Sequence, residues 1–252
     1  MSFYSHKDSK IYYRILGKKG ALPLVFLHGW AQTNQFWNNL IKELTPKYRL
    51  VIFDLPGCGN SQSPTTIWNL KDYSHMLHDF LVNQGLKKPV LIGHSFGARI
   101  ALDYASRFSL RKLVLYSPGI NRRYNILNWS HRKLSQLSLI FRFTSLMYWL
   151  QSQIFRPKSF KNNHVFKKIN TRTMISIYLK KDNIQISLLK KIDIPTLILA
   201  GEKDKILPLS SIKKFAKYIK SKKIYIFSDA HHCAHIEFQK AFLFQLKSFL
   251  DD

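Results

Sequence analysis

The segment "SDAHHCAHIEF", Ser228–Phe238, holds three histidines within five residues: His231, His232 and His235. Three kinds of site fit such a group: a metal site, a run of surface histidines, or a loop that supplies one catalytic base. A metal site needs further convergent ligands, and the HHxxH pattern lacks the glutamate of the HExxH motif. The catalytic interpretation requires that the rest of the chain provide a nucleophile and an acid.

Ser95 is the candidate nucleophile. It lies in Gly93-His94-Ser95-Phe96-Gly97, a G-x-S-x-G pattern that follows an apolar run and precedes a helical pattern. In this context the glycines permit a strained strand-to-helix turn that projects Ser95 Oγ above a sheet. The helix N-terminus then directs N–H groups and the positive end of its dipole toward developing negative charge. We favour this interpretation over a capping serine with two turn glycines.

A serine hydroxyl is a weak nucleophile that needs a base, and the base needs an orienting carboxylate. After a G-x-S-x-G turn the acid and then the histidine follow on loops after later strands. Asp204 in "LILAGEKDKILP" is the candidate acid, and Glu202, nearer the strand, is its rival. The loop "SPGINRR" after an earlier strand has no acid, which favours Asp204. The segment with His232 begins after the next strand.

The elements that must position these residues follow a strand–helix rhythm. Short apolar runs predict strands in Pro23–Gly29, Arg49–Gly57, Lys88–Ser95, Lys112–Gly119, Pro195–Asp204 and Lys222–Ala230. Continuous rather than alternating runs are typical of strands buried on both faces of a sheet. Amphipathic patterns predict helices near Asn34–Leu44, Leu70–Gln84, Phe96–Phe108, Leu209–Ile219 and Phe238–Leu250. The alternation predicts a mostly parallel α/β sheet, with "SKIYYRILG" as an antiparallel edge strand.

The stretch from Ile120 to Ile192 interrupts this rhythm, because it contains no strand-like run. A structureless loop of that length would be unusual in a compact domain. We therefore predict a helical cap at 120–192, inserted after the sixth strand into a core formed by 1–119 and 193–252. Its charged residues are basic except for Asp182.

Composition indicates one well-cored domain with an insertion, since the chain has 252 residues, of which 46% are hydrophobic. Two cysteines imply no disulfide framework. The N-terminus lacks an apolar segment of signal-peptide type and no long apolar stretch predicts a membrane span, so we expect a cytoplasmic protein. No cofactor motif is apparent.

The formal net charge of +26 would attract anions, acidic proteins, nucleic acid or anionic lipid. The basic residues are spread over the whole chain, and no nucleic-acid-binding module is recognisable. We therefore favour a compositional origin for the charge and expect no specific nucleic acid partner. An acidic protein partner stays open, and peripheral membrane contact is not predicted.

The motifs together resemble the α/β-hydrolase superfamily over essentially the whole chain. "FLHGWAQTNQFW", "FDLPGCGNSQSP", "GHSFGARIAL", "LAGEKDKILP" and "DAHHCAHIEF" stand in the order expected for that family. The resemblance implies a catalytic triad of Ser95, Asp204 and His232. His231 then stands where the family commonly has glycine, and it is the alternative base. His235 falls in the following turn.

The same resemblance assigns the remaining site residues. The oxyanion hole would be formed by the backbone N–H groups of Phe96, after the nucleophile, and Trp30, in the "HGW" segment. His28 and Gly29 would shape that turn and, with His94, border the substrate pocket. Trp30, Phe96, Phe36 and Trp37 are candidate apolar pocket walls, although core packing explains the last two equally well. The loop Asp54–Pro64 is interpreted as a structural turn held by Asp54.

The predicted reaction is hydrolysis of a small or medium acyl ester through an acyl-enzyme, without cofactor or metal. The serine disfavours the dehalogenase and epoxide hydrolase branches, which have aspartate there. The chain is similar to carboxylesterases such as the pimeloyl-carrier-protein methyl ester esterase, and an acidic acyl carrier protein would suit a basic cap. Alternatives on the same triad are a carbon–carbon bond hydrolase or a lyase of the menaquinone-pathway type. A membrane-lipid lipase and a non-catalytic binding protein are less favoured.

Overall fold

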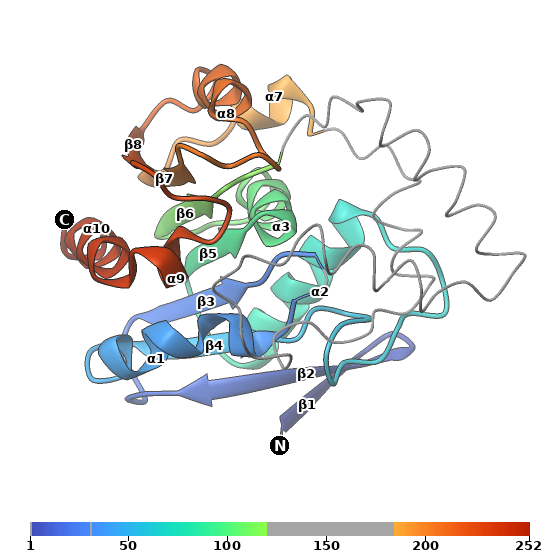
Figure 1. Cartoon of the computed structure of the whole chain (residues 1–252). Coiled ribbons are helices and arrows are strands. Elements are labelled where there is room, and N and C mark those ends of the chain that lie inside the picture. The colour runs from blue at the N-terminus through green and yellow to red at the C-terminus, as the bar shows by residue number, and fades with distance from the viewer. Residues whose placement is uncertain (1, 31, 120–183) are drawn as a thin grey trace, which may run out of the picture.

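The computed structural model describes residues 2–30, 32–119 and 184–252. These residues form an eight-stranded sheet in the order β1-β2-β4-β3-β5-β6-β7-β8 (Figure 1). The strands β3 to β8 run parallel to one another, whereas β1 pairs antiparallel with β2 and β2 pairs antiparallel with β4. The strands are β1 (Ser2–His6), β2 (Ser9–Leu16), β3 (Pro23–Leu27), β4 (Arg49–Phe53), β5 (Val90–His94), β6 (Lys112–Tyr116), β7 (Thr196–Gly201) and β8 (Lys222–Phe227).

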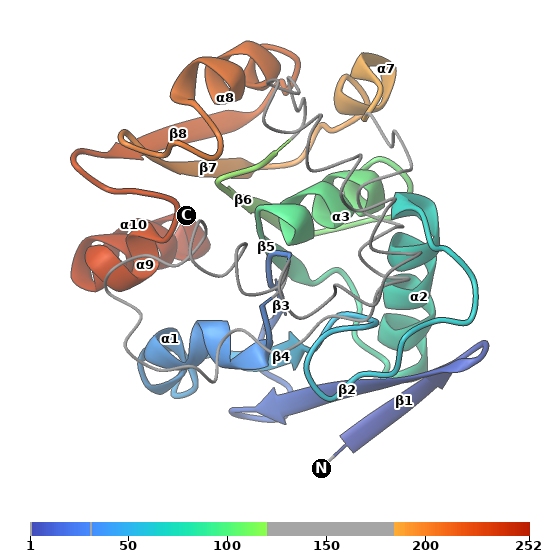
Figure 2. The ribbon, with the colours of Figure 1, turned by 45° about the vertical axis from the view of Figure 1, so that its right-hand side comes forward.

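Helices cover both faces of the sheet. Figures 1 and 2 show α2 and α3 on one side of the strands and α1 and α10 on the other. All five predicted helices are found close to the ranges that the apolar pattern indicates, whereas two short helices, α7 and α9, were not predicted individually. The helices are the 3₁₀ helix η1 (Asn34–Trp37), α1 (Asn38–Leu44), α2 (Leu70–Asn83), α3 (Phe96–Ala105), α7 (Ile186–Leu189), α8 (Leu209–Ala216), α9 (Ala234–Glu237) and α10 (Gln239–Asp251).

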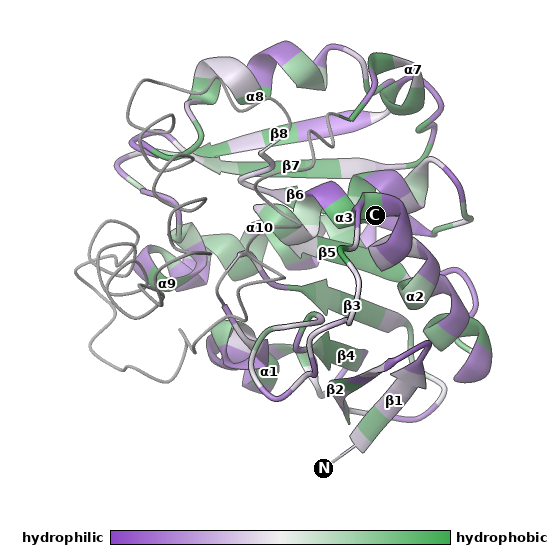
Figure 3. Cartoon of the chain, turned by 90° about the vertical axis from the view of Figure 1, so that its right-hand side faces the viewer, coloured by the Kyte–Doolittle hydropathy of each residue, from purple (hydrophilic) through white to green (hydrophobic). Residues whose placement is uncertain are grey.

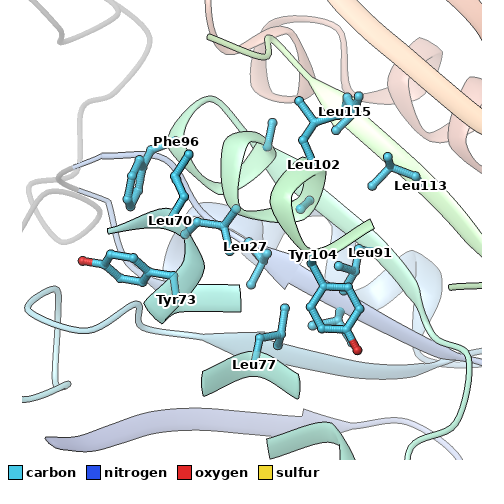
Figure 4. Close-up of a cluster of buried hydrophobic side chains, with 14 of the residues drawn as sticks. Leu27, Leu70, Tyr73, Leu77, Leu91, Phe96, Leu102, Tyr104, Leu113 and Leu115 are labelled. Carbon is cyan, nitrogen blue, oxygen red and sulfur yellow. The ribbon is translucent and has the colours of Figure 1, made fainter. Parts of the chain in front are cut away.

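The core consists of two hydrophobic layers, one on each face. Along β3, Val25 and Leu27 point into the layer with α2, α3 and α8, whereas Leu24 and Phe26 point into the layer with α1 and α10. Figure 4 shows Leu27, Leu77 and Leu102 among the buried side chains of the first layer. Successive residues of a strand face opposite sides. A strand covered on both sides therefore needs a continuous apolar run, as the sequence indicates for β3.

The predicted mostly parallel α/β sheet flanked by helices is confirmed, but the edges differ from the prediction. The sequence "SKIYYRILG" forms β2, which is antiparallel as expected but lies inside the sheet. The edge is β1, a short strand that the sequence analysis did not predict. It pairs with β2 through a hairpin in which His6 is opposite Ser9 and Lys7 adopts φ 53°.

The other edge strand, β8, corrects a second expectation. Its apolar run predicts a strand buried on both faces, yet Lys222, Lys223 and Ile224 are exposed. Figure 3 shows purple residues on β8, in contrast to the green strands β3 and β4. Only β7 pairs with β8 in the described sheet, and its outer edge therefore tolerates lysine.

Most of the predicted helical cap, 120–183, lies outside the described residues. The described residues that follow it contribute Ile184, Leu189 and Ile192 to the layer beside α2 and α3. The division into core and cap stays a prediction. Among the helices of the described ranges, none has the length and apolar character needed to cross a bilayer.

Candidate active site

The turn between β5 and α3 carries the candidate nucleophile. Ser95 adopts φ 50° and ψ −104°, a strained conformation for a residue with a side chain. Its backbone N–H donates to the carbonyl oxygen of Tyr116 at 2.9 Å. Ser95 stands at the N-cap of α3, but its side chain makes no capping hydrogen bond. Nothing here favours the interpretation of Ser95 as a capping serine, and the strained turn matches a nucleophile elbow.

Close backbone packing explains both glycines of the pattern. A Cβ on Gly97 would lie 2.2 Å from the carbonyl oxygen of Leu27 and 2.6 Å from that of His28. A Cβ on Gly93 would lie 2.5 Å from the carbonyl oxygen of Gly97. Real Cβ atoms do not approach backbone oxygens so closely. The glycines thus allow α3 to pack directly against the ends of β3 and β5, and this contact fixes where Ser95 lies.

The structure brings Asp204 and His232 together, as the sequence analysis expects. Asp204 lies after β7 and His232 after β8, and the Nδ1 atom of His232 is 2.7 Å from Oδ2 of Asp204. The other oxygen, Oδ1, accepts the backbone N–H groups of Ile206 at 2.9 Å and Leu207 at 3.0 Å. The Asp204 side chain is fully buried and that of His232 is 13% exposed. This arrangement suits a carboxylate that orients a histidine.

The rival residues occupy different surroundings. Glu202 is exposed beside the strand end. The His231 side chain is 57% exposed, and its Nδ1 lies 3.0 Å from Oε2 of Glu237. The same oxygen accepts the backbone N–H of His231 at 3.0 Å. Neither rival takes part in the Asp204–His232 pair.

His235 is a buried structural histidine. Its Nε2 lies 3.0 Å from the carbonyl oxygen of Phe36, and its Nδ1 lies 3.2 Å from the hydroxyl of Tyr116. Nε2–H therefore donates to Phe36, and Nδ1 accepts from Tyr116. Burial lowers the pKa of His235 to about 3, so the ring is neutral. In the described ranges, no group of three or more His, Cys, Asp or Glu side chains is arranged to hold a metal ion.

The loop after β3 is braced by His28. This fully buried ring has Nδ1 2.7 Å from the carbonyl oxygen of Gly29, and its Nε2 accepts the backbone N–H of Leu55 at 2.9 Å. Burial lowers the pKa of His28, against the raising effect of the Asp54 charge. The imidazole thus joins the loops after β3 and β4, the loop-holding role that the motif suggested. Contact of His28 with substrate stays a prediction.

Asp54 holds the neighbouring loop. Its Oδ1 accepts the backbone N–H of Asn34 at 2.6 Å and the side-chain amide of Asn34 at 2.8 Å. Its Oδ2 accepts the backbone N–H of Asn60 at 2.8 Å. A Cβ on Gly59, which has φ +55°, would lie 2.3 Å from that oxygen. These bonds match the structural turn that the sequence analysis assigns to this loop.

The predicted oxyanion donors lie at the expected chain positions. Phe96 begins α3, and the first N–H groups of a helix have no acceptor within the helix. Trp30 follows Gly29, whose own N–H donates to the side-chain oxygen Oε1 of Gln32 at 2.7 Å. The assignment of Phe96 and Trp30 as donors stays a prediction. Gln32 is a residue to which the sequence analysis assigned no role, although it lies within the "FLHGWAQTNQFW" motif.

The four residues that were candidate pocket walls lie in different surroundings. Phe36 and Trp37 are fully buried in the layer with α1 and α10, in line with core packing. The Phe96 ring packs edge-on against Tyr73 with ring centroids 5.3 Å apart, beside Leu70 (Figure 4). Trp30 is half-buried. His94 is fully buried between the loop that carries Gln32 and the loop that carries His232. Its position therefore suits shaping the site better than direct contact with substrate.

The chain is similar to known proteins over most of its length. A model of the family described as alpha/beta hydrolase fold matches residues 23–239. A pimeloyl-[acyl-carrier protein] methyl ester esterase of Wigglesworthia glossinidia brevipalpis is 29% identical over 242 residues, which cover 87% of this chain and 90% of that protein.

Solved structures are also similar to this chain. The structure of MenH from S. aureus has a TM-score of 0.78 and 26% identity, and the match covers 95% of this chain and 97% of that chain. The esterase EaEST from Exiguobacterium antarcticum has a TM-score of 0.82, 23% identity and coverage of 97% and 96%. At the latter identity the likeness concerns the fold alone.

Proposed function

The chain belongs to the α/β-hydrolase family, and within that family we propose that it hydrolyses a carboxylic ester through an acyl-enzyme on Ser95. The family match confirms the resemblance seen in the motifs, and the chain is a hydrolase of esterase type. The proposal adds the residues and the substrate class. Ser95 is the nucleophile, His232 the base, Asp204 the orienting acid, and the N–H groups of Phe96 and Trp30 the oxyanion donors.

The single observation that carries this proposal is the 2.7 Å contact between Asp204 Oδ2 and His232 Nδ1. A carboxylate is an acceptor, so Nδ1 must carry the ring proton in the neutral imidazole. Nε2 then holds a lone pair, which is the state that a general base requires. Further support comes from the strained turn that carries Ser95 on the strand next but one to β7.

The proposed reaction has two halves. Ser95 Oγ bonds to the ester carbonyl carbon while His232 Nε2 accepts the hydroxyl proton, and the resulting oxyanion accepts N–H bonds from Phe96 and Trp30. His232 then gives the proton to the departing alkoxide oxygen as the carbon–oxygen bond breaks. Water attacks the acyl carbon while His232 accepts its proton, and His232 returns that proton to Ser95 Oγ as the bond between Oγ and the acyl carbon breaks and the acid leaves.

The substrate class that we propose is an ester of a small or medium acyl chain. The esterase relative named above acts, by its name, on an ester borne by an acyl carrier protein. Carrier proteins are acidic, and this chain has a formal net charge of +26. Opposite charges accelerate and orient association. A carrier-borne ester is therefore the form of the substrate that charge favours.

A panel of p-nitrophenyl esters from acetate to laurate tests the ester chemistry. Wild type should hydrolyse the panel with an optimum at one chain length, and Ser95→Ala should abolish turnover. A folded wild type that hydrolyses none of these esters would contradict the proposal. Turnover would then be sought with carbon–carbon bond hydrolase and lyase substrates, because "GARIAL" after the nucleophile resembles those branches, which use the same triad.

A matched pair of natural-type esters tests the carrier. A short-chain dicarboxylate methyl ester should be cleaved faster when borne by acyl carrier protein than as the free methyl ester of equal length. The difference should shrink as salt screens the charges. Equal rates at low salt would exclude carrier recognition without affecting the ester chemistry.

A further inference from the structure

His94, the last residue of β5, lies between two loops of the candidate site. The ring is fully buried. Its Nε2 is 3.1 Å from the backbone carbonyl oxygen of His232, and its Nδ1 is 3.1 Å from Oε1 of Gln32. Gln32 in turn accepts the N–H of Gly29. One imidazole therefore contacts both the loop that carries the base and the loop that is to supply an oxyanion donor.

The two contacts compete for one proton. Burial, with the nearby His232 as a lesser cause, lowers the pKa of His94 well below its usual range. A neutral imidazole has a single N–H, whereas both facing atoms are acceptors. Gln32 Oε1 already has a donor in Gly29 N–H at the shorter distance of 2.7 Å. The tautomer with the proton on Nε2 is therefore favoured, because it donates a hydrogen bond to the carbonyl oxygen of His232.

The ring is also held in place by its aromatic neighbours. Phe36 stacks on His94 with ring centroids 4.6 Å apart and an interplanar angle of 26°. Tyr116 packs at 4.6 Å from another side. The His232 ring itself lies 4.6 Å from His94. A donor fixed this firmly can fix the group that accepts from it.

Asp204 alone does not determine where the His232 ring lies. A single hydrogen bond at Nδ1 permits the ring to swing about that contact, and Nε2 would then move relative to Ser95. Anchoring the backbone carbonyl of His232 removes this freedom. We propose that His94 is a positioning residue whose Nε2–H holds the main chain of His232, so that the base lies within reach of Ser95. This inference rests on the proposed function, and it adds a residue that acts through His232.

Three substitutions of His94 separate this role from simple packing. In His94→Gln the side-chain amide reaches the place of Nε2 and can still donate to the His232 carbonyl. In His94→Asn the shorter amide reaches only the place of Nδ1. His94→Phe keeps an aromatic ring for the stack with Phe36 but has no donor. Asparagine and glutamine thus carry the same amide group at two distances from the main chain.

The readout is the inactivation of Ser95 by a fluorophosphonate, which needs no knowledge of the natural substrate. We expect His94→Gln to react at close to the wild-type rate, and Asn and Phe to lose up to about 100-fold, the cost of misplacing a catalytic group by about 1 Å. In ester hydrolysis the loss should fall on kcat rather than KM. A folded His94→Phe that reacts within about threefold of wild type would overturn the inference. So would His94→Gln being no better than His94→Asn.

A measurement on wild type covers the case in which the variants do not fold. With ¹⁵N-labelled histidine, the ring nitrogen shifts of His94 should report the Nε2–H tautomer. The Nδ1–H tautomer would overturn the inference. The proposed function fails separately, if Ser95→Ala reacts with the fluorophosphonate as fast as wild type.

Discussion

Asp204 Oδ2 lies 2.7 Å from His232 Nδ1, and the rest of the Asp204 carboxylate is held by its own loop. Because Oδ1 accepts the N–H groups of Ile206 and Leu207, the carboxylate has a fixed orientation. The Asp204 side chain is fully buried, so water does not compete with it for the hydrogen bond from His232. The pair thereby combines a defined tautomer with a defined direction.

Replacing Asp204 with asparagine should therefore remove most of the activity and little of the stability. The amide oxygen can still accept from Ile206 and Leu207, but an amide N–H2 facing His232 Nδ1 favours the wrong tautomer. A loss of about 10⁴-fold in kcat is expected from the same change in a serine protease triad. Ester hydrolysis and urea unfolding measure the two effects. Glu202→Gln is the matched control, since Glu202 is exposed, and an equal loss in that variant would contradict the assignment.

The adjacent histidines should differ sharply when each is replaced with alanine. His232→Ala removes the partner of Asp204 and should abolish ester hydrolysis. His231→Ala removes a ring that is 57% exposed and pairs with Glu237. A contact made by so exposed a ring contributes little to stability, about 0–1 kcal/mol, so this variant should keep its fold and most of its kcat. Steady-state kinetics of the two purified proteins decides the question, and loss of activity in His231→Ala alone would make His231 the base.

The motifs predicted much of this site because each describes a local backbone shape. A G-x-S-x-G sequence between a strand and a helix leaves few conformations for Ser95. The loops that follow parallel strands all lie at the same edge of the sheet, so residues on them can be expected to meet. His235 shows the limit. It is the same residue type as His232 three positions earlier, and its burial depends on Phe36 and Tyr116, which lie far away in the sequence. No local pattern records such contacts.

The sheet shows the same distinction. Apolar runs located the strands β3 to β8 within a few residues, but their order across the sheet is not a local property. The run in β8 therefore suggested a buried strand, although Lys222 and Lys223 already marked its free edge. The strand β1 was not predicted, because this half-exposed edge strand of five residues has no continuous apolar run. Gln32 was not predicted for a different reason, since its role depends on side-chain contacts with Gly29 and His94.

Gly97→Ala should prevent α3 from packing on β3. The new Cβ would lie 2.2 Å from the carbonyl oxygen of Leu27, which belongs to the backbone and cannot rotate away. We expect a loss of about 3 kcal/mol or more in the free energy of unfolding, at the upper end of overpacking effects. Gly85→Ala is the control, because its Cβ would meet nothing within 4 Å and only its φ of +62° is unfavourable, a cost of about 1–2 kcal/mol.

Urea unfolding of both variants measures this difference, and a Gly97→Ala protein that cannot be obtained folded while Gly85→Ala can would agree with it. Equal destabilisation by the two substitutions would show that the close approach of α3 to β3 is not needed.

The buried histidines should make the protein sensitive to mild acid. The pKa of His235 is about 3 in the folded chain against 6.5 ordinarily, and burial also lowers the pKa values of His28 and His94. Between those values the unfolded chain binds a proton that the folded chain does not, so stability falls as the pH falls. Above 6.5 both states are neutral and the effect vanishes. Well inside this window His235 contributes a slope of about 1.4 kcal/mol per pH unit, and His28 and His94 act in the same direction.

His235→Asn isolates one of these contributions. The variant should be less stable than wild type at pH 7, because Tyr116 and Phe36 lose ring partners, but its stability should fall less steeply as the pH is lowered. Urea unfolding at several pH values from 7 down to 5 measures the slopes. The upper part of this interval also avoids most of the carboxylate titrations, whose ordinary pKa values are about 4. Parallel slopes in the two proteins would mean that His235 accepts a proton without unfolding, and the neutral ring bonded to Phe36 would then be the wrong description.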